Sequence, residues 1–253
     1  MNPQTVPLTA QQLADLMPDA TQLDSDEPEM ESSLHYAQLA LLVACLEWLW
    51  QERSDFFIGA NLTIYSSREQ LKNKDFRGPD FFLVKQTKKR PRRSWVVWEE
   101  GGQYPDVIIE LLSPGTAQVD RTLKKALYQD RFRTPEYFWF SPDTLEFEGY
   151  RLMGQQYADI TSNANGWLWS EVLNLFLGVQ DGVLRYFQPS GELIPTPEEA
   201  AVKAQLEAQQ AQTETQQAQM EARQAQMQAQ EAETRAARLA EQLKSLGIEP
   251  EEP

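Results

Sequence analysis

The aromatic residues of this chain are confined to its first three quarters. All seven Trp, eight Tyr and eleven Phe of the 253 residues precede residue 190. A packed core depends on such large apolar side chains, so it must be built from this part of the chain. From Pro197 onward the chain consists mostly of Ala, Gln and Glu, with no aromatic residue and no Gly before Gly247. The sequence therefore predicts a globular domain of about 190 residues followed by a segment of a different kind.

Small apolar residues recur in the C-terminal segment at alternating spacings of four and three. The series runs from Ala204 to Leu246 and contains nine Ala, one Thr and three Leu. This heptad pattern is typical of a coiled coil. Because alanine buries little area, we expect two such helices to form a homodimer that is close but weak, except near Leu239 and Leu243. A single solvated helix is the alternative, since Ala, Gln and Glu favour helix formation by themselves.

Four regions are predicted along the chain. Residues 1–30 form an acidic N-terminal arm that we expect to be loosely held, residues 31–195 the globular domain, residues 197–247 the coiled-coil helix and residues 248–253 a tail. Inside the domain, a helical apolar pattern over residues 33–53 precedes candidate strands at 56–65, 81–84, 94–99, 105–112 and 136–140. This order predicts a mixed α/β or α+β domain.

Charge is distributed unevenly along the chain. The net charge of −15 argues against a protein that coats nucleic acid without selectivity. Residues 1–31 carry seven acidic and no Lys or Arg residues, whereas residues 68–93 carry ten basic and three acidic residues. We predict that the loop 85–93 contacts phosphates through its basic side chains, which are Lys85, Lys88, Lys89, Arg90, Arg92 and Arg93. A solvated hairpin loop is the more common explanation of a single charge run, and it stays open.

The cysteine content and the N-terminal sequence bear on the compartment. The single cysteine, Cys45, excludes an internal disulfide and fits a reducing environment. Residues 1–20 have neither a basic start nor a continuous apolar run, so they predict neither a signal peptide nor a membrane anchor. We therefore expect a cytoplasmic protein that does not enter a membrane.

An acid interrupts the most apolar strand of the domain. The run from Pro105 to Leu112 predicts a buried strand, and Glu110 lies inside it. An unpaired buried charge costs several kcal/mol, so this carboxylate must be paired, protonated or bound to a metal. In the predicted helix that follows, Asp120 and Lys124 lie on one face because they are four residues apart. A solvent-facing ion pair between these two residues is the alternative to a catalytic role.

Asp80 follows Gly78-Pro79 at the start of another predicted strand. Neighbouring strands lie about 5 Å apart, so the carboxylates of Asp80 and Glu110 are able to share one divalent ion. Mg²⁺ prefers oxygen ligands and retains several waters, which suits two carboxylates. Asp106 is a rival for the role of Asp80, because it also follows a proline and shares a strand face with Glu110. The single histidine, His35, excludes a multi-histidine zinc site, and the chain has no nucleotide-binding glycine loop.

The acids and the lysine occur in the order of a known nuclease family. The relevant residues are Glu31, Pro79-Asp80, the run from Glu110 to Pro114, Asp120 with Lys124 and Tyr128, and Pro135 to Tyr137. In this order the chain resembles the Uma-type restriction endonuclease family of the PD-(D/E)XK nuclease superfamily over residues 26–190. The resemblance is strongest to a branch with a similar tail of Ala, Gln and Glu. It implies a restriction-endonuclease-like core with a central mixed sheet flanked by helices, and a Mg²⁺-dependent cut of a DNA phosphodiester.

Carried over residue by residue, the resemblance makes Asp80 and Glu110 the metal ligands, Lys124 the catalytic lysine and Glu31 the glutamate of the first helix. Leu112 stands two residues after Glu110, where the common Glu-x-Lys pattern of the superfamily has its lysine. The site therefore closes only if Lys124 reaches back over the end of the sheet. We expect a Mg²⁺-dependent DNA endonuclease. The alternatives are a catalytically silent scaffold whose C-terminal helix binds a protein partner, and a nuclease that acts on RNA or branched DNA.

Overall fold

A computed structural model describes residues 23–27, 32–67, 78–113, 115 and 117–245 of the chain. The chain divides into two compact units, residues 1–197 and residues 198–253. The predicted end of the globular domain, at residue 195, lies next to this division.

A six-stranded mixed sheet forms the centre of the first unit, with its strands in the order β1-β3-β5-β6-β7-β8. Their bounds are β1 Phe56–Ala60, β3 Phe81–Lys85, β5 Val107–Leu111, β6 Glu136–Phe140, β7 Phe147–Met153 and β8 Gln156–Asp159. β5 and β6 run parallel, whereas the other neighbouring pairs are antiparallel. The structure thus confirms the predicted α+β class with a central mixed sheet.

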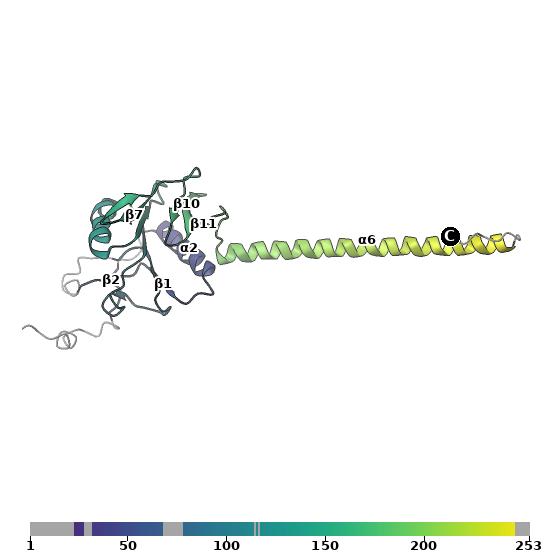
Figure 1. The fold of residues 1–253 in the computed structure, drawn as a ribbon, viewed down its shortest axis with the longest axis horizontal. Helices are drawn as coiled ribbons and strands as arrows, with labels where there is room; N and C mark the ends of the chain where they lie inside the picture. Colours follow the sequence, from purple (N-terminus) through teal and green to yellow (C-terminus); the bar gives the residue numbers. More distant parts are fainter. Residues whose placement is uncertain (1–22, 28–31, 68–77, 114, 116, 246–253) are drawn as a thin grey trace, which may run out of the picture. The chain divides into compact units, whose positions relative to one another are not determined.

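Two smaller sheets and helix α2 complete the framework of this unit. β2 and β4 pair in parallel, and β9, β10 and β11 form an antiparallel sheet. The bounds are α2 Ser33–Leu49, β2 Ile64–Tyr65, β4 Trp95–Val96, β9 Leu168–Ser170, β10 Leu175–Gln180 and β11 Val183–Phe187. Helix α2 packs against β11 and β1 (Figure 1). The single strand predicted over residues 56–65 is therefore two strands, and the strand predicted over residues 94–99 ends at Val96.

Strand β5 separates two apolar cores. Val107, Ile109 and Leu111 belong to the core that includes the buried face of α2, whereas Ile108 belongs to the core on the other side of the sheet. Every residue of β5 is buried, because both faces of the sheet are covered. Since side chains alternate along a strand, Glu110 points to the same side as Ile108.

The segment that follows β5 is helical but contains two wide turns. Ordinary helical turns alternate with π-helical turns in the order α4 Ala117–Val119, η2 Asp120–Lys124, α5 Lys125–Leu127 and η3 Tyr128–Phe132. The sequence pattern predicted an ordinary helix here. π-helical turns inside helices are rare and frequently occur at functional sites. This segment covers the face of the sheet to which Glu110 points, because its buried residues Tyr128 and Phe132 share a core with Ile108.

The second unit contains one long helix, α6 (Pro197–Ser245), drawn from green to yellow in Figure 1. None of its 49 residues is buried. Its large apolar side chains, including Leu206, Met220, Met227 and Leu239, are exposed. Pairing of this helix with a second copy stays a prediction. In the part of the chain that the structure describes, no helix combines the length and apolar character that crossing a membrane requires.

Candidate active site

The register of strands β3 and β5 sets Asp80 beside Glu110. These strands are antiparallel with Phe81 opposite Ile109, so the next residues outward, Asp80 and Glu110, face each other. The backbone N–H of Asp80 donates a hydrogen bond to Glu110 Oε2 at 3.3 Å, and the N–H of Leu111 donates to Asp80 Oδ2 at 2.7 Å. The structure brings the two acids together at the edge where β5 ends.

Lys124 reaches back over the sheet to this pair of acids. Its Nζ lies 3.0 Å from Glu110 Oε2 and 2.9 Å from Asp120 Oδ1. Tyr128 OH donates a hydrogen bond to the other oxygen, Glu110 Oε1, at 2.6 Å. Asp120, Lys124 and Tyr128 therefore all point from the helical segment toward Glu110. Asp120 and Tyr128 were not among the predicted catalytic residues, although their spacing of four from Lys124 was the signal that could have found them.

Burial dominates the electrostatics of the cluster. It raises the pKa of the Glu110 carboxyl to about 7, an effect that the Lys124 ammonium opposes and the Asp80 carboxylate strengthens. Burial also raises the pKa of Asp80. For Lys124 burial lowers the pKa, but the carboxylates of Glu110, Asp120 and Asp80 outweigh it and raise the pKa above its ordinary value. Lys124 is therefore protonated at neutral pH, whereas the carboxyl group of Glu110 is close to the midpoint of its titration there.

The charges of the cluster do not balance. The carboxylates of Asp80, Glu110 and Asp120 surround a single ammonium, that of Lys124. When all four groups are ionised, two negative charges are in excess. A buried excess of negative charge favours the uptake of a proton or a cation. This imbalance distinguishes the cluster from an ordinary buried ion pair.

A fourth carboxylate, that of Glu27, lies close to the cluster. Glu27 Oε1 accepts a hydrogen bond from Thr63 Oγ1 at 2.7 Å and a second from the backbone N–H of Gly78, two residues before Asp80. Burial raises the pKa of Glu27, and its charge interacts with those of Lys124 and Glu110. The acidic arm was expected to be loosely held, but its residues 25–27 are hydrogen-bonded to Thr63. The sequence carried no signal for this, because Glu27 is one of seven acids in residues 1–31.

The sequence also named Glu31 and Asp106 as candidates for this site. Glu31, the predicted first-helix glutamate, falls outside the described residues. Asp106, the rival of Asp80, lies at the opposite end of β5, and its Oδ2 accepts a hydrogen bond from the backbone N–H of Lys85 at 2.7 Å. It lies four positions before Glu110 along the strand, which corresponds to about 13 Å. The structure thus places Asp80, and not Asp106, next to Glu110.

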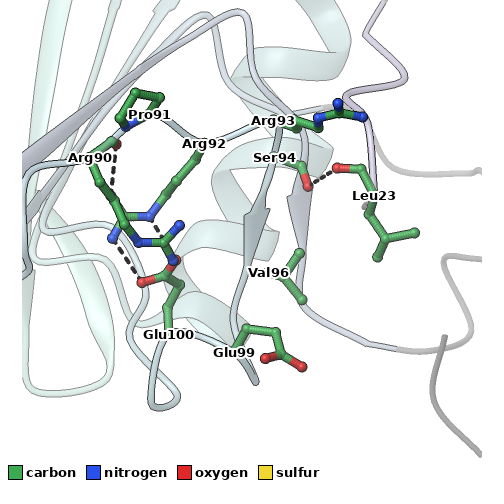
Figure 2. Close-up of a pocket in the computed structure, with 9 residues that line it drawn as sticks. All are labelled: Leu23, Arg90, Pro91, Arg92, Arg93, Ser94, Val96, Glu99 and Glu100. Carbon is green, nitrogen blue, oxygen red and sulfur yellow. Dashed lines mark hydrogen bonds and ion pairs between the residues drawn. The ribbon is translucent and has the colours of Figure 1, made fainter. Parts of the chain in front are cut away.

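The side chain of Arg92, in the predicted DNA-binding loop, is almost fully buried, at 2% exposure. Its guanidinium donates to both carboxylate oxygens of Glu100, at 2.6 and 2.9 Å. Its remaining N–H groups donate to the carbonyl oxygens of Lys88 and Arg90 and to Thr87 Oγ1. With all five N–H groups engaged, Arg92 organises the loop. Figure 2 shows its guanidinium turned toward Glu100, together with that of Arg90.

The other basic side chains of the loop lie nearer the surface, and most contact an acid or a carbonyl group. Lys85 Nζ donates to the carbonyl oxygen of Val172. The remaining ion pairs are Lys89 with Glu47, Arg90 with Glu100 and Arg93 with Asp24. A depression of about 330 Å³ lies beside Arg90 and Arg93, but Glu99 and Glu100 also line it, so its charge is mixed (Figure 2). The ion pairs of Lys89 and Arg93 are exposed, and exposed pairs contribute little stability. These cations are therefore able to exchange partners.

The donor set at the cluster suits a hard cation with few protein ligands. Among the described residues, no three His, Cys, Asp or Glu side chains are placed to hold a metal ion together. Asp80 and Glu110 supply two adjacent carboxylates, and Mg²⁺ is commonly bound by one or two carboxylates with waters in its remaining positions. The two acids and the excess negative charge around them therefore fit Mg²⁺, and they do not fit a closed structural site.

The fold and this cluster define an α+β protein in which carboxylates and a lysine gather where a central strand of a mixed sheet, β5, ends. A family model matches residues 22–183, and that family is Uma2, described as "Putative restriction endonuclease". The chain belongs to the Uma2 family, and this match confirms the resemblance found in its sequence.

One similar solved structure is a crystal structure described as a "putative nuclease belonging to DUF820" from Anabaena variabilis ATCC 29413. The two chains are 16% identical, the match covers 70% of this chain and 97% of the other, and the TM-score is 0.44. No protein with a curated description matches this chain.

Proposed function

We propose that this chain is a Mg²⁺-dependent endonuclease that hydrolyses DNA phosphodiester bonds. In this proposal Asp80 and Glu110 bind the metal ion and Lys124 is the catalytic lysine. The contact of Lys124 Nζ with Glu110 Oε2 at 3.0 Å carries the proposal, because it joins residues fourteen positions apart in the sequence. Membership of the Uma2 family supports it. Glu31, which the sequence resemblance adds as a first-helix glutamate, remains part of the proposed site.

The three side chains have separable tasks in this reaction. Bound Mg²⁺ supplies a water of lowered pKa and neutralises charge that develops on the phosphodiester. Asp80 and Glu110 would fix the position of that ion at the edge of the sheet. Lys124 stays protonated, so it is suited to donate hydrogen bonds to the attacking water or a phosphate oxygen rather than to remove a proton.

We further propose that the loop 85–93 contacts the DNA backbone. The five candidates in this loop are Lys85, Lys88, Lys89, Arg90 and Arg93, whereas Arg92 acts indirectly by holding the loop in shape. Substitution of exposed Lys88 by Ala should weaken binding to any DNA sequence about two- to threefold and lower the salt dependence by about one counterion. An unchanged salt dependence in a fluorescence titration would remove Lys88 from the interface.

Two copies of the chain are proposed to pair through α6. The heptad series of alanine positions that ends with Leu239 and Leu243 supports this pairing, since all of this face is exposed in the single chain. A two-fold pair of subunits would present one site to each DNA strand. The mass in solution, measured for the full chain and for a chain ending at residue 197, tests the pairing. A full-length protein that is monomeric at all concentrations contradicts it.

The buried thiol of Cys45 agrees with the proposed cytoplasmic location.

A catalytically silent scaffold is the second candidate. It is favoured by the fact that the Glu110 carboxylate already has partners on both oxygens, Tyr128 on one and Lys124 on the other. In this reading α6 binds another protein, and the cluster only stabilises the fold.

Nicking of a supercoiled plasmid, with Mg²⁺ or with a chelator, separates the two candidates. The wild type should nick in Mg²⁺ alone, Asp80→Asn, Glu110→Gln and Lys124→Met should lose this activity, and Lys125→Met should retain it. Lys125 is the matched control, because its ammonium lies over the ring of Tyr150 and not in the cluster. RNA and branched DNA are tested in parallel. A wild type that is inert on every substrate, or variants as active as the wild type, would rule out an enzyme at this site.

A further inference from the structure

The ammonium of Lys124 has two buried carboxylate partners, of which the proposed chemistry uses one. It lies 3.0 Å from Glu110 Oε2 and 2.9 Å from Asp120 Oδ1. The side chains of both acids are almost fully buried, at 0% and 2% exposure, whereas that of Lys124 is 18% exposed. Asp120 belongs to the helical segment and not to the strand edge where the proposed metal ligands lie.

The contact with Glu110 conflicts with metal binding. Glu110 Oε1 accepts the hydrogen bond of Tyr128, whereas Oε2 accepts one from the backbone N–H of Asp80, so Oε2 lies on the side of Asp80 and is the oxygen that would face a shared ion. Lys124 Nζ lies within hydrogen-bond distance of this same Oε2. A divalent ion and an ammonium that approach one oxygen repel each other strongly in a buried site. The lysine must therefore move away from Glu110, at least in part, when an ion binds.

Asp120 is placed to receive the lysine. Its backbone is held by Tyr137, whose OH donates to the Asp120 carbonyl oxygen at 2.9 Å. Its carboxylate is already in contact with Nζ, so the ammonium can leave Glu110 without being left unpaired in a buried position. The wide π-helical turn η2 begins at Asp120 and ends at Lys124, and thus keeps donor and acceptor on the same element.

We propose that Asp120 is a positioning residue that retains the Lys124 ammonium when a divalent ion occupies Asp80 and Glu110. Lys124 then has two states: with Asp120 and Glu110 before the ion binds, and with Asp120 alone afterwards. In the second state the amine stays beside the metal, where it is able to contact a phosphate. The inference rests on the proposed function for the identity of the metal ligands, but it concerns metal affinity and not the rate of cleavage.

Calorimetric titration with Mg²⁺, at constant pH and ionic strength, tests this exchange. Lys124→Met removes the competing ammonium and should tighten Mg²⁺ binding about tenfold or more. Asp120→Asn removes the alternative acceptor and should weaken binding about three- to tenfold. Lys125→Met, which deletes the same charge one residue away, should change binding less than about twofold. Thermal unfolding of each variant verifies that it is folded.

The double variant Asp120→Asn with Lys124→Met distinguishes positioning from simple charge. If Asp120 acts through Lys124, its substitution changes Mg²⁺ affinity less than about twofold once the lysine is gone. If Asp120 acts only as a nearby negative charge, its effect persists at full size in the double variant, and the inference is wrong. Should Asp120→Asn not fold, a Lys124→Met variant that binds Mg²⁺ no more tightly than Lys125→Met overturns the inference by itself.

The outcome for cleavage is independent of this result. A wild type that binds Mg²⁺ but cleaves no nucleic acid defeats the proposed function and leaves the exchange of Lys124 to be decided by the affinities. If neither the wild type nor Lys124→Met binds Mg²⁺, the exchange is refuted.

Discussion

Two buried glutamates in adjacent parallel strands have opposite surroundings. Glu136 in β6 is 1% exposed, and Glu110 in β5 is fully buried. Glu136 Oε1 accepts hydrogen bonds from Nε and Nη2 of Arg151, at 3.0 and 2.9 Å, and from the backbone N–H of Glu171 at 2.8 Å. Its other oxygen accepts a hydrogen bond from Ser170 Oγ. One buried carboxylate is therefore matched by one guanidinium and by neutral donors.

The environment of Glu136 connects the sheets. Arg151 also donates to the carbonyl oxygen of Trp169 at 2.7 Å, so the pair joins β6 and β7 to β9. Arg151 also contacts the carboxylate of Glu171 at 2.9 Å, but that side chain is 64% exposed. Glu110, by contrast, shares the ammonium of Lys124 with a second buried carboxylate, that of Asp120, and lies opposite a third, that of Asp80. A carboxylate with a matched cation stabilises the fold, whereas one surrounded by other acids is ready to bind a proton or a cation. The comparison teaches that the partners of a buried acid, and not its burial, indicate its role.

The largest effect is expected at Glu136. Arg151→Ala leaves this carboxylate buried without its cation and should lower the free energy of unfolding by about 3–5 kcal/mol in a denaturant titration. Arg131→Ala, at an exposed position, is the control and should change it by less than about 0.5 kcal/mol. A loss below about 1 kcal/mol for Arg151→Ala would break the distinction between the two glutamates.

The free energy of unfolding should depend on pH through the titration of the Glu110 carboxyl group. Its pKa rises from 4.5 in an unfolded chain to about 7 in the folded protein. Between these values the folded state retains a proton that the unfolded state releases, so the stability is fully present below pH 4.5 and is lost as the pH rises through about 7. This group should contribute about 3 kcal/mol to the decrease. We expect Glu110→Gln to remove that part of the slope, and an identical pH profile for both proteins would refute the assignment.

Activity should separate the same two sites. Glu110→Gln should lower plasmid cleavage about 100-fold or more, because a proposed metal ligand is lost, while the free energy of unfolding at pH 8 stays equal or increases. Activity is measured per folded molecule. Arg151→Ala, assayed below its unfolding temperature, should cleave as the wild type does. If both variants lose cleavage at equal folded fraction, the difference between the surroundings of Glu110 and Glu136 does not reflect a difference in function.

Two hydroxyl donors provide the smallest and most closely matched test. Ser170→Ala and Tyr128→Phe each remove one hydroxyl hydrogen bond from a buried glutamate, Glu136 and Glu110 respectively. Each should lower the free energy of unfolding by about 1–3 kcal/mol. Tyr128→Phe should in addition change the Mg²⁺ concentration needed for half-maximal cleavage about threefold, because Tyr128 orients a proposed ligand. The same change in Ser170→Ala would contradict the assignment of Glu136 to stability alone.

The sequence predicted those residues of the candidate site that a pattern of neighbouring residues marks. Glu110 stood out because a charged residue interrupts an apolar strand, and Asp80 because it begins another strand. Lys124 shares a helix face with Asp120, but this spacing also fits a solvent-facing ion pair, so its assignment as the catalytic lysine required the resemblance to a nuclease family. Glu27 was missed because its contact with Gly78 joins segments 51 residues apart. Such contacts depend on how distant segments pack, which a local pattern does not encode.

The basic loop also shows what a local sequence pattern does not predict. Six cations in a short run predicted a phosphate-binding surface, but the run cannot show which cations are internal. Arg92 is surrounded by Glu100, by backbone carbonyl groups and by the rings of Phe57 and Trp95. Only its position in the folded chain distinguishes it from Lys88, which is exposed.

The sequence by itself determined where a core can form, that the segment from Pro197 onward is helical, and that Glu110 needs a partner. Each follows from short-range chemistry: aromatic content, helix propensity and the free-energy cost of a buried charge. Tertiary structure decided which partner each buried acid has. The register of β3 against β5 aligned Asp80 with Glu110, and the helical segment returned Lys124 to them, whereas β7 supplied an arginine to Glu136. Strand register and the return path of a helix depend on the packing of the whole domain, and for this reason two similar residues in adjacent strands acquired different partners.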